Sequence, residues 1–281
     1  MKFIEAFDRA KKRVQHLKGF DTELPIFEII FAKSKIVKNK ISFAAMRNTK
    51  IDFNFHDFSR EVFDYYKHQK PLSQITHETK FLDLTLVVDE KIFEPRADTE
   101  CWTNAIIQML KLEKKNYKVL DLCAGTGCIG LAIKRHVPFC DVTLVDINQK
   151  AIDNIKTNAT NLNLKVKTIC ADYLKFIKQD SEIFDVVVCN PPYLGVDELH
   201  QNLIRYEHKI AFNNSKNEME FYHNILTNRS LITKEGGKII FEFGYSQKVM
   251  MTNLLKQLKL LDQSFFLRDL SGTYRCVVIS V

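Results

Sequence analysis

Hydrophobic residues in the first seventy positions recur at helical intervals and show no strand alternation. The apolar residues of the first pattern are three or four positions apart: Phe3, Phe7, Ala10, Val14 and Leu17. Gly19 supplies a stop for this helix. Further helical patterns cover Pro25–Phe31 and Ser59–Tyr66. The pattern therefore predicts a small helical domain over residues 1–70.

The pattern changes between residues 71 and 97. The segment Phe81–Asp89 alternates loosely and is rich in residues that favour strands. It predicts a short strand or β-hairpin that links the helical domain to the rest of the chain.

From Asp98 onward, short apolar runs alternate with helical patterns. Strands are expected at 118–123, 142–145, 166–169, 185–189 and 238–243. Helices are expected at 99–112, 129–136, 148–161, 218–231 and 246–259. This rhythm predicts an α/β domain over residues 98–281, with a mostly parallel sheet and right-handed crossovers. Two last strands without a helix between them, 264–269 and 274–281, predict a terminal antiparallel hairpin and complete a seven-stranded sheet.

Composition is that of an ordinary soluble protein, with 46% hydrophobic and 27% charged residues. No stretch approaches the roughly 18 consecutive apolar residues of a membrane helix. The N-terminus is charged from the start and has no apolar signal core, so a cytoplasmic location is expected. The seven cysteines form no Cys-x-x-Cys pair, and no metal site is expected.

The net charge of +7 is concentrated in the predicted helical domain. Residues 1–70 contain 15 Lys and Arg against 9 Asp and Glu, whereas the rest of the chain is nearly neutral. The excess includes Lys33, Lys35, Lys38 and Lys40. Such a patch would suit an RNA-rich or acidic partner, and a merely solvated face is the alternative.

A glycine-rich loop follows the first strand expected in the α/β domain. It runs from Asp121 to Gly130 as Asp-Leu-Cys-Ala-Gly-Thr-Gly-Cys-Ile-Gly. Glycines let the backbone pass close to a ligand, and the N-terminus of the following helix presents free N–H groups. Many nucleotide-binding proteins share such a turn, so by itself it does not identify the ligand.

Three acidic residues bear on the identity of the ligand, and two of them, Asp121 and Asp172, favour S-adenosylmethionine over a dinucleotide. Asp146 ends the second strand, nineteen residues beyond Gly127, where it would accept hydrogen bonds from a ribose hydroxyl pair. Asp121 precedes the loop and would face the cationic methionine end, while Asp172 follows the third strand and would meet the adenine amino group. Capping or solubility is the alternative role for each acid.

The strand at 185–189 ends in Asn190-Pro191-Pro192-Tyr193, on the sheet edge where open α/β sheets bind ligands. The two prolines remove two backbone donors and fix two φ angles, which makes the preceding carbonyls rigid. The side-chain oxygen of Asn190 and the main-chain oxygen of Pro191 can each accept a hydrogen bond from one NH2 group. Such a nitrogen, in an amide or adenine, is a poor nucleophile because its lone pair is delocalised. Two acceptors would orient it toward a methyl sulfonium and favour the transition state, with Tyr193 stacked on the planar group.

The segment Phe93-Glu-Pro-Arg-Ala-Asp-Thr-Glu100 lies about twenty residues before the glycine loop. Together with Asn-Pro-Pro-Tyr, it resembles the motifs of the HemK/PrmC release-factor glutamine methyltransferases. Glu242-Phe-Gly-Tyr in a later strand and Pro71–His77 also align with that family. The resemblance covers essentially the whole chain and implies a class I, Rossmann-like methyltransferase domain with a small N-terminal helical domain.

The resemblance also implies the roles of individual residues. The substrate, the glutamine of the Gly-Gly-Gln motif in a peptide-chain release factor, would be bound by Asn190, Pro191, Pro192 and Tyr193. The expected cofactor contacts are Asp121, Cys123, Ala124, Gly125, Thr126, Gly127, Asp146, Ile147, Asp172 and Asn190. The upstream signature that would line the site is Pro95, Arg96, Asp98, Thr99 and Glu100. The helical domain would choose the protein substrate, and a monomer without a stable nucleic-acid partner is expected.

The chain departs from the family pattern at several positions. Cys123 occupies a position where many members have glycine, Gln74 and His77 replace the usual Tyr and Gly, and Ala97 replaces the second proline of the signature. After Tyr206-Glu207 the usual Pro-x-x-Ala-Leu sequence is missing. Two other functions stay open: an N6-adenine methyltransferase acting on nucleic acid, which shares the Asn-Pro-Pro-Tyr motif, and a non-catalytic module that binds the release factor or ribosome.

Overall fold

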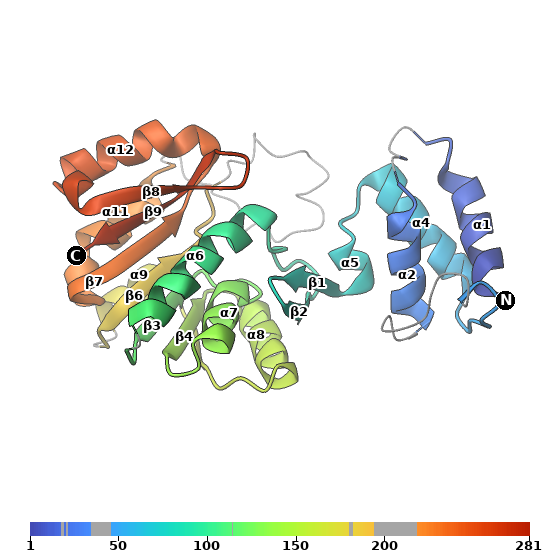
Figure 1. Cartoon of the computed structure of the whole chain (residues 1–281), viewed down its shortest axis with the longest axis horizontal. Coiled ribbons are helices and arrows are strands. Elements are labelled where there is room, and N and C mark those ends of the chain that lie inside the picture. Colours follow the sequence, from blue (N-terminus) through green and yellow to red (C-terminus); the bar gives the residue numbers. More distant parts are fainter. Residues whose placement is uncertain (18–19, 21, 35–45, 114, 180–181, 194–217) are drawn as a thin grey trace. The chain divides into compact units, whose positions relative to one another are not determined.

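The computed structural model describes residues 1–281 except 18–19, 21, 35–45, 114, 180–181 and 194–217 (Figure 1). Several features of the sequence analysis therefore lie outside the described residues, namely Gly19, Lys35, Lys38, Lys40 and the segment at 206–207. The described residues form two compact units, Met1–Glu78 and the chain from Thr79 onward. The finer boundaries at residues 70 and 97 stay a prediction.

The first unit is helical, as the spacing predicts. Its helices are α1 (Phe3–Val14), α2 (Leu24–Ser34), α4 (Phe55–His68) and the single turn α5 (Ser73–Thr76). The buried positions of α1 recur at three and four residues and join those of α2 and α4 in one hydrophobic cluster. The side chain of Asn54 caps α4 by accepting hydrogen bonds from the N–H groups of His56 and Asp57.

The second unit is built on a seven-stranded sheet of order β5-β4-β3-β6-β7-β9-β8 in the described part of the chain. The strands are β3 (Lys118–Leu122), β4 (Asp141–Asp146), β5 (Lys167–Cys170), β6 (Phe184–Cys189), β7 (Thr233–Glu242), β8 (Ser264–Arg268) and β9 (Tyr274–Ser280). Neighbours from β5 to β7 pair in parallel, and β9 pairs antiparallel with both β7 and β8. The predicted parallel sheet with a terminal antiparallel hairpin is confirmed.

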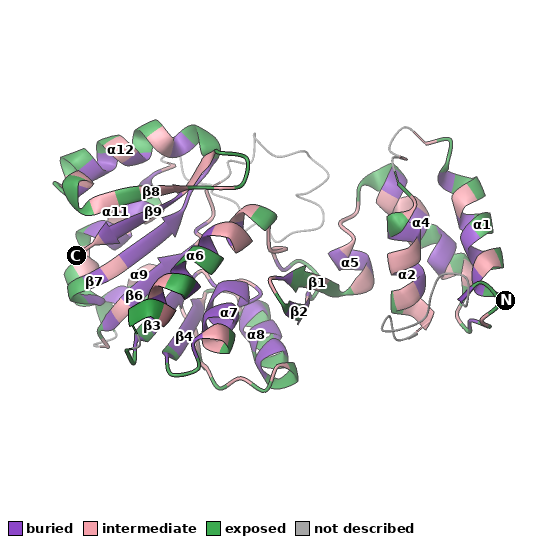
Figure 2. Ribbon diagram, in the orientation of Figure 1, coloured by how far each residue is buried: buried purple, intermediate pink, exposed green. Residues whose placement is uncertain are grey.

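Helices cover both faces of this sheet (Figure 1). One face packs on α6 (Ala97–Glu113), α7 (Cys128–His136) and α8 (Gln149–Asn161). The other packs on α9 (Tyr173–Gln179), α11 (Glu220–Thr227) and α12 (Lys248–Gln257). Alternate residues point to opposite faces, so Val119 joins the first cluster and Leu120 the second. The central strands are buried on both faces (Figure 2), which explains their continuous apolar runs.

A two-stranded hairpin, β1 (Glu78–Phe81) and β2 (Leu84–Val87), precedes the sheet. From Thr79 on, this hairpin belongs to the second unit. Phe81 lies in the cluster that covers the first sheet face. The side chain of Asn158 on α8 accepts a hydrogen bond from the N–H of Val87 (2.7 Å) and donates one to its carbonyl (3.0 Å). The hairpin is therefore anchored on α8.

Strand β7 begins five residues earlier than the apolar run suggests. Its first part, Thr233–Gly237, is polar and exposed except for its ends, so hydropathy does not reveal it. The pairing register of β6 with β7 shifts between Phe184 and Val186 of β6. A Cβ on Gly237 would lie 2.9 Å from the carbonyl oxygen of Asp185, so glycine allows this close approach.

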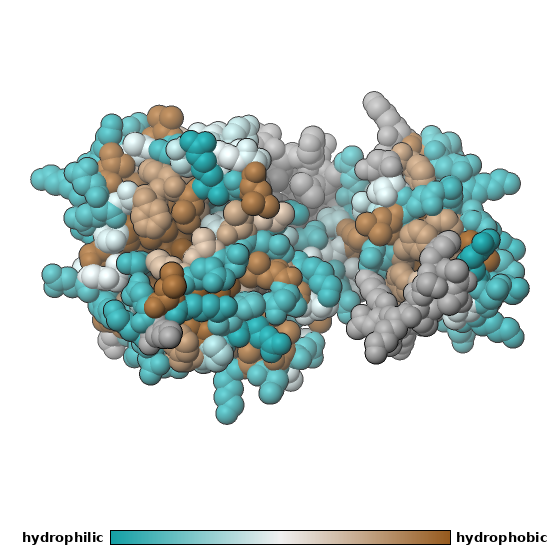
Figure 3. Space-filling view, in the orientation of Figure 1, coloured by the Kyte–Doolittle hydropathy of each residue, from teal (hydrophilic) through white to brown (hydrophobic). Residues whose placement is uncertain are grey.

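Among the described residues, no helix has the length and apolarity needed to cross a membrane. The visible face of both units in Figure 3 carries polar side chains, in teal, around smaller apolar areas, in brown.

Candidate active site

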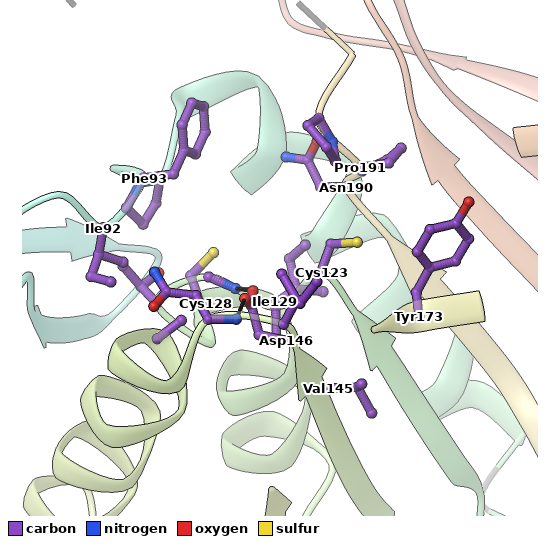
Figure 4. Close-up of a pocket in the computed structure, with 18 of the residues that line it drawn as sticks. Ile92, Phe93, Cys123, Cys128, Ile129, Val145, Asp146, Tyr173, Asn190 and Pro191 are labelled. Carbon is purple, nitrogen blue, oxygen red and sulfur yellow. Dashed lines mark hydrogen bonds between the residues drawn. The ribbon is translucent and has the colours of Figure 1, made fainter. Parts of the chain in front are cut away.

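A pocket of the second unit lies where strands β3, β4, β5 and β6 end. Figure 4 shows its walls, which the loops after these strands form together with the segment before α6. Its lining residues include Cys123–Thr126, Asp146–Asn148, Ala171–Tyr173, Asn190–Tyr193, Pro95 and Thr99. The two motifs that the sequence places on one sheet edge thus share one cavity.

The glycine loop is held in place by Asp146. One carboxylate oxygen accepts a hydrogen bond from the N–H of Gly125 (2.9 Å), and the other accepts one from the N–H of Asn148 (2.8 Å). Gly125 and Gly127 have φ angles of +55° and +79°, a region that disfavours other residues. Cys123 adopts a φ of +58° without being glycine. The acid at the end of β4 thereby fixes the loop that forms one wall of the pocket.

Asp121 does not lie on the pocket wall. Its side chain is fully buried, and one carboxylate oxygen accepts a hydrogen bond from the N–H of Gly130 in α7 (2.8 Å). The other oxygen is buried without a partner among the described residues. Burial raises the pKa of Asp121 to about 7, although the hydrogen bond from Gly130 lowers it. The expected direct contact of Asp121 with the ligand's cationic end has no counterpart in the lining of the pocket, and its role stays a prediction.

Asp172 lines the pocket and also caps α9. One of its oxygens accepts hydrogen bonds from the N–H groups of Leu174 (3.1 Å) and Lys175 (3.0 Å). Next to it, the ring of Tyr173 stacks on Phe221 with a centroid distance of 4.6 Å. Both rings line the pocket. Sequence reasoning missed them because neither belongs to a motif and α9 was not expected.

The Asn-Pro-Pro-Tyr segment forms another wall of the pocket, and all four of its residues line it. The side-chain amide nitrogen of Asn190 donates a hydrogen bond to the hydroxyl of Thr99 (3.4 Å). The Tyr193 hydroxyl donates to the carboxylate of Glu242 (2.9 Å), and burial raises the pKa of Tyr193 well above its usual range.

Only part of the upstream signature reaches the pocket. Pro95 and Thr99 line it. Arg96 packs on the ring of Phe93, 4.8 Å from its centroid. Asp98 forms an ion pair with Arg275 (3.0 Å), and Glu100 accepts a hydrogen bond from the N–H of Leu82 in the hairpin (2.9 Å). The other three signature residues thus fix the local structure around α6.

Glu242, at the end of β7, is the residue that sequence reasoning left without a role. Its side chain is 1% exposed, yet it contacts residues of both motifs. Burial raises its pKa, while hydrogen bonds from Thr99, Trp102 and Tyr193 lower it. Its place in the Glu-Phe-Gly-Tyr segment was the available signal. No cluster of three potential metal ligands occurs among the residues that the structure describes.

Known proteins resemble this chain in sequence and in fold. Residues 85–211 match the Methyltransferase small domain family. A solved structure, T. thermophilus 16S rRNA N2 G1207 methyltransferase in complex with AdoMet and guanosine, has a TM-score of 0.53 at 16% identity. The match covers 72% of this chain and 49% of that chain, and it shows a shared fold.

Several sequence relatives carry the name release factor glutamine methyltransferase. The protein of Clostridium acetobutylicum is 34% identical over 206 residues, which are 70% of this chain and 72% of the relative. That of Fusobacterium nucleatum is 28% identical over 98% of this chain and 78% of the relative. On the grounds of this identity and coverage, the chain belongs to the release factor glutamine methyltransferase family.

Proposed function

We propose that the protein transfers a methyl group from S-adenosylmethionine to the side-chain amide nitrogen of the Gly-Gly-Gln glutamine in a peptide-chain release factor. The observation that carries the proposal is the shared cavity: Asn190 and Pro191 line the same pocket as Gly125 and Asp146. A site that orients an NH2 group therefore adjoins a nucleoside-type binding loop. The family relationship supports the choice of an amide over adenine.

The pocket residues fit S-adenosylmethionine, which supplies an electrophilic methyl group on a sulfonium. The loop Cys123–Gly127 offers backbone that a ligand can approach closely, because a Cβ on Gly125 would meet nothing within 4 Å. Asp146 offers a carboxylate on the pocket wall, and Asp172 follows the next strand. Ile147, the Tyr173 ring and the Phe221 ring provide apolar surface for a planar base. We assign cofactor binding to these residues.

The Asn-Pro-Pro-Tyr segment orients the nitrogen that is methylated. The side-chain oxygen of Asn190 and the carbonyl oxygen of Pro191 each accept one N–H of the substrate amide. Pro191 and Pro192 have no N–H groups, so neither competes for these acceptors. In the transition state the substrate N–H groups become more acidic, and both hydrogen bonds strengthen. The proton leaves after transfer, so the reaction requires no strong base in the pocket.

We assign recognition of the release factor to the helical domain, residues 1–70, whose charge of +6 distinguishes it from the nearly neutral remainder. Of its lysines, Lys33 pairs with Glu61 at 2.6 Å, and Lys11 pairs with Glu23. Part of the positive charge is therefore balanced within the domain. We expect a monomeric protein in the cytoplasm.

The proposal is tested by mass spectrometry of a release factor incubated with the protein and methyl-labelled S-adenosylmethionine. One added methyl on the glutamine of Gly-Gly-Gln is expected, and none on a control release factor with that glutamine replaced by glutamate. A DNA duplex rich in adenine is assayed in parallel. Label in adenine with an unlabelled release factor would overturn the proposal in favour of nucleic-acid methylation.

A further inference from the structure

A buried carboxylate connects the two motifs of the pocket without lining it. Glu242 ends β7, and its side chain is 1% exposed. One oxygen accepts hydrogen bonds from the Thr99 hydroxyl (2.6 Å) and the Trp102 indole N–H (2.7 Å), and the other accepts one from the Tyr193 hydroxyl (2.9 Å). Among the described residues no lysine or arginine forms an ion pair with it. Burial of a carboxylate costs free energy unless hydrogen-bond donors satisfy its oxygens. Thr99, Trp102 and Tyr193 supply these donors, so the carboxylate and the three side chains hold one another in position.

The link to Asn190 runs through Thr99. A threonine hydroxyl has one hydrogen, and in Thr99 that hydrogen is donated to Glu242. The hydroxyl oxygen can then only accept, and it faces the side-chain amide of Asn190 at 3.4 Å. If this amide were flipped, two acceptor oxygens would oppose each other. The carboxylate therefore selects the orientation in which the Asn190 NH2 faces Thr99 and its oxygen points away, available to a substrate N–H.

The same carboxylate positions Tyr193. The Tyr193 hydroxyl donates to Glu242, and its carbonyl accepts a hydrogen bond from the side chain of Gln247 (3.2 Å). Gln247 is itself fixed because its side-chain oxygen accepts the N–H of Gly244 (3.0 Å). The two residues that contact Tyr193 lie at the end of β7 (Glu242) and shortly after it (Gln247). The end of this strand therefore fixes the last residue of Asn-Pro-Pro-Tyr as well as its first.

We propose that Glu242 is a positioning residue for methyl transfer: acting through Thr99 it fixes the amide orientation of Asn190, and acting directly it fixes the ring of Tyr193. Glu242 touches neither substrate nor cofactor, and its effect is on turnover rather than on cofactor binding. This inference rests on the proposed function, since it concerns the orientation of the substrate NH2 group.

A matched pair of substitutions tests the path through Thr99. Thr99→Val and Trp102→Phe each remove one of the two donors to the same Glu242 oxygen, but only Thr99 leads to Asn190. We expect Thr99→Val to lower kcat by on the order of tenfold to a hundredfold, because a misplaced reacting group costs that much. Trp102→Phe is expected to lower the melting temperature and to keep kcat within about twofold.

Two further variants separate positioning from a packing defect. Thr99→Ser keeps the hydroxyl and is expected to restore most of the lost kcat. In the double variant Thr99→Val/Asn190→Ala, the valine is expected to cause little further loss, because its effect passes through the side chain already removed. Affinity for S-adenosylmethionine, measured by calorimetry, is expected to match the wild type in Thr99→Val and Thr99→Ser.

The outcomes distinguish the inference from the proposed function. If the wild type methylates the release factor but Thr99→Val retains its kcat, or Trp102→Phe loses as much, the inference is wrong. Additive losses in the double variant would contradict it as well. If the wild type binds S-adenosylmethionine and leaves the release factor unmethylated, the proposed function fails, and the inference fails with it.

Discussion

The carboxylate of Asp146 and the backbone of Gly125 are joined by a hydrogen bond of 2.9 Å, so an acid on one strand fixes a glycine loop that follows another. The second oxygen of the same carboxylate accepts the N–H of Asn148, the residue that caps α8. The acid thus ties together two of the loops that form the pocket. Its spacing from the glycines therefore has a structural reason besides the proposed contact with a ribose.

We expect Asp146→Asn to weaken binding of S-adenosylmethionine by about tenfold or more. The amide can accept only one of the two hydrogen bonds, and each bond to a charged acceptor contributes roughly 1.5–3 kcal/mol. Calorimetric titration measures the effect. Asp153→Asn on α8, where the carboxylate is exposed and accepts a hydrogen bond from Gln149, serves as the control. Equal affinities of the two variants would contradict a role of Asp146 in the cofactor site.

Asn190→Ala is expected to lower kcat by about 10²–10³-fold, since it removes one of the two acceptors that orient the substrate nitrogen. Single-turnover assays with saturating cofactor measure the chemical step directly. Asn104→Ala, an exposed position of α6, is the control. Near-normal turnover of Asn190→Ala would exclude the proposed mechanism.

Asp121 makes stability depend on pH. Its folded-state pKa of about 7 lies above the ordinary 3.8, so the folded protein binds the proton more tightly than the unfolded chain. The stability that this group contributes is present below pH 3.8 and is lost as the pH rises through 7.

Asp121→Asn keeps an acceptor for the N–H of Gly130 and removes the titration. Between pH 4 and pH 8 the free energy of unfolding of the wild type is expected to fall relative to this variant by up to about 4 kcal/mol. Urea denaturation of both proteins at several pH values gives the difference between their free energies of unfolding. Other titrating groups contribute equally to both proteins, so their contributions cancel in this difference. Parallel pH curves for the two proteins would contradict the raised pKa.

Cysteine labelling offers a test of the pocket that needs no substitution. Cys123 and Cys101 are both partly exposed, but only Cys123 lines the pocket. S-adenosylmethionine is expected to slow alkylation of Cys123 by N-ethylmaleimide and to leave Cys101 unaffected, as peptide mass mapping would show. Equal protection of both thiols would point to a global change, and no protection of Cys123 would place the cofactor elsewhere.

Removal of residues 1–78 is expected to preserve affinity for S-adenosylmethionine and to abolish methylation of the release factor. The hydrophobic clusters of the α/β unit consist of residues from Phe81 onward, so the unit retains its own core. Circular dichroism and thermal unfolding establish that the fragment is folded. A folded fragment that does not bind the cofactor would contradict this division of roles.

The α/β fold could be predicted because its strands are short apolar runs and its helices carry periodic patterns. The sequence predicts β4 at 142–145 and α8 at 148–161, within about a residue of their observed ends. Elements that depend on backbone pairing were harder to find. The polar start of β7 is separated from its apolar part by a shift in the pairing register with β6. The short helix α9 begins at an Asp172 cap rather than with a long periodic pattern.

The candidate site was predictable wherever a motif marks a strand end, as for Asn190 and Gly125. Side-chain direction was not predictable. Asp121 lies beneath the loop because its strand position points it toward α7, and sequence spacing does not reveal this. Likewise, Glu242 and Thr99 are 143 positions apart, and only the packing of α6 on the sheet brings them together.

Trp102 is the only tryptophan of the chain, and it lies in the α/β unit with its indole N–H on Glu242. The protein therefore contains an intrinsic fluorescence probe next to the pocket. Emission excited selectively from tryptophan reports on the α/β unit alone, because the helical unit has none. When that unit unfolds, an indole that is 2% exposed enters water, and its emission shifts to the red. Comparison with circular dichroism, which registers both units, then separates the unfolding of one unit from that of the other.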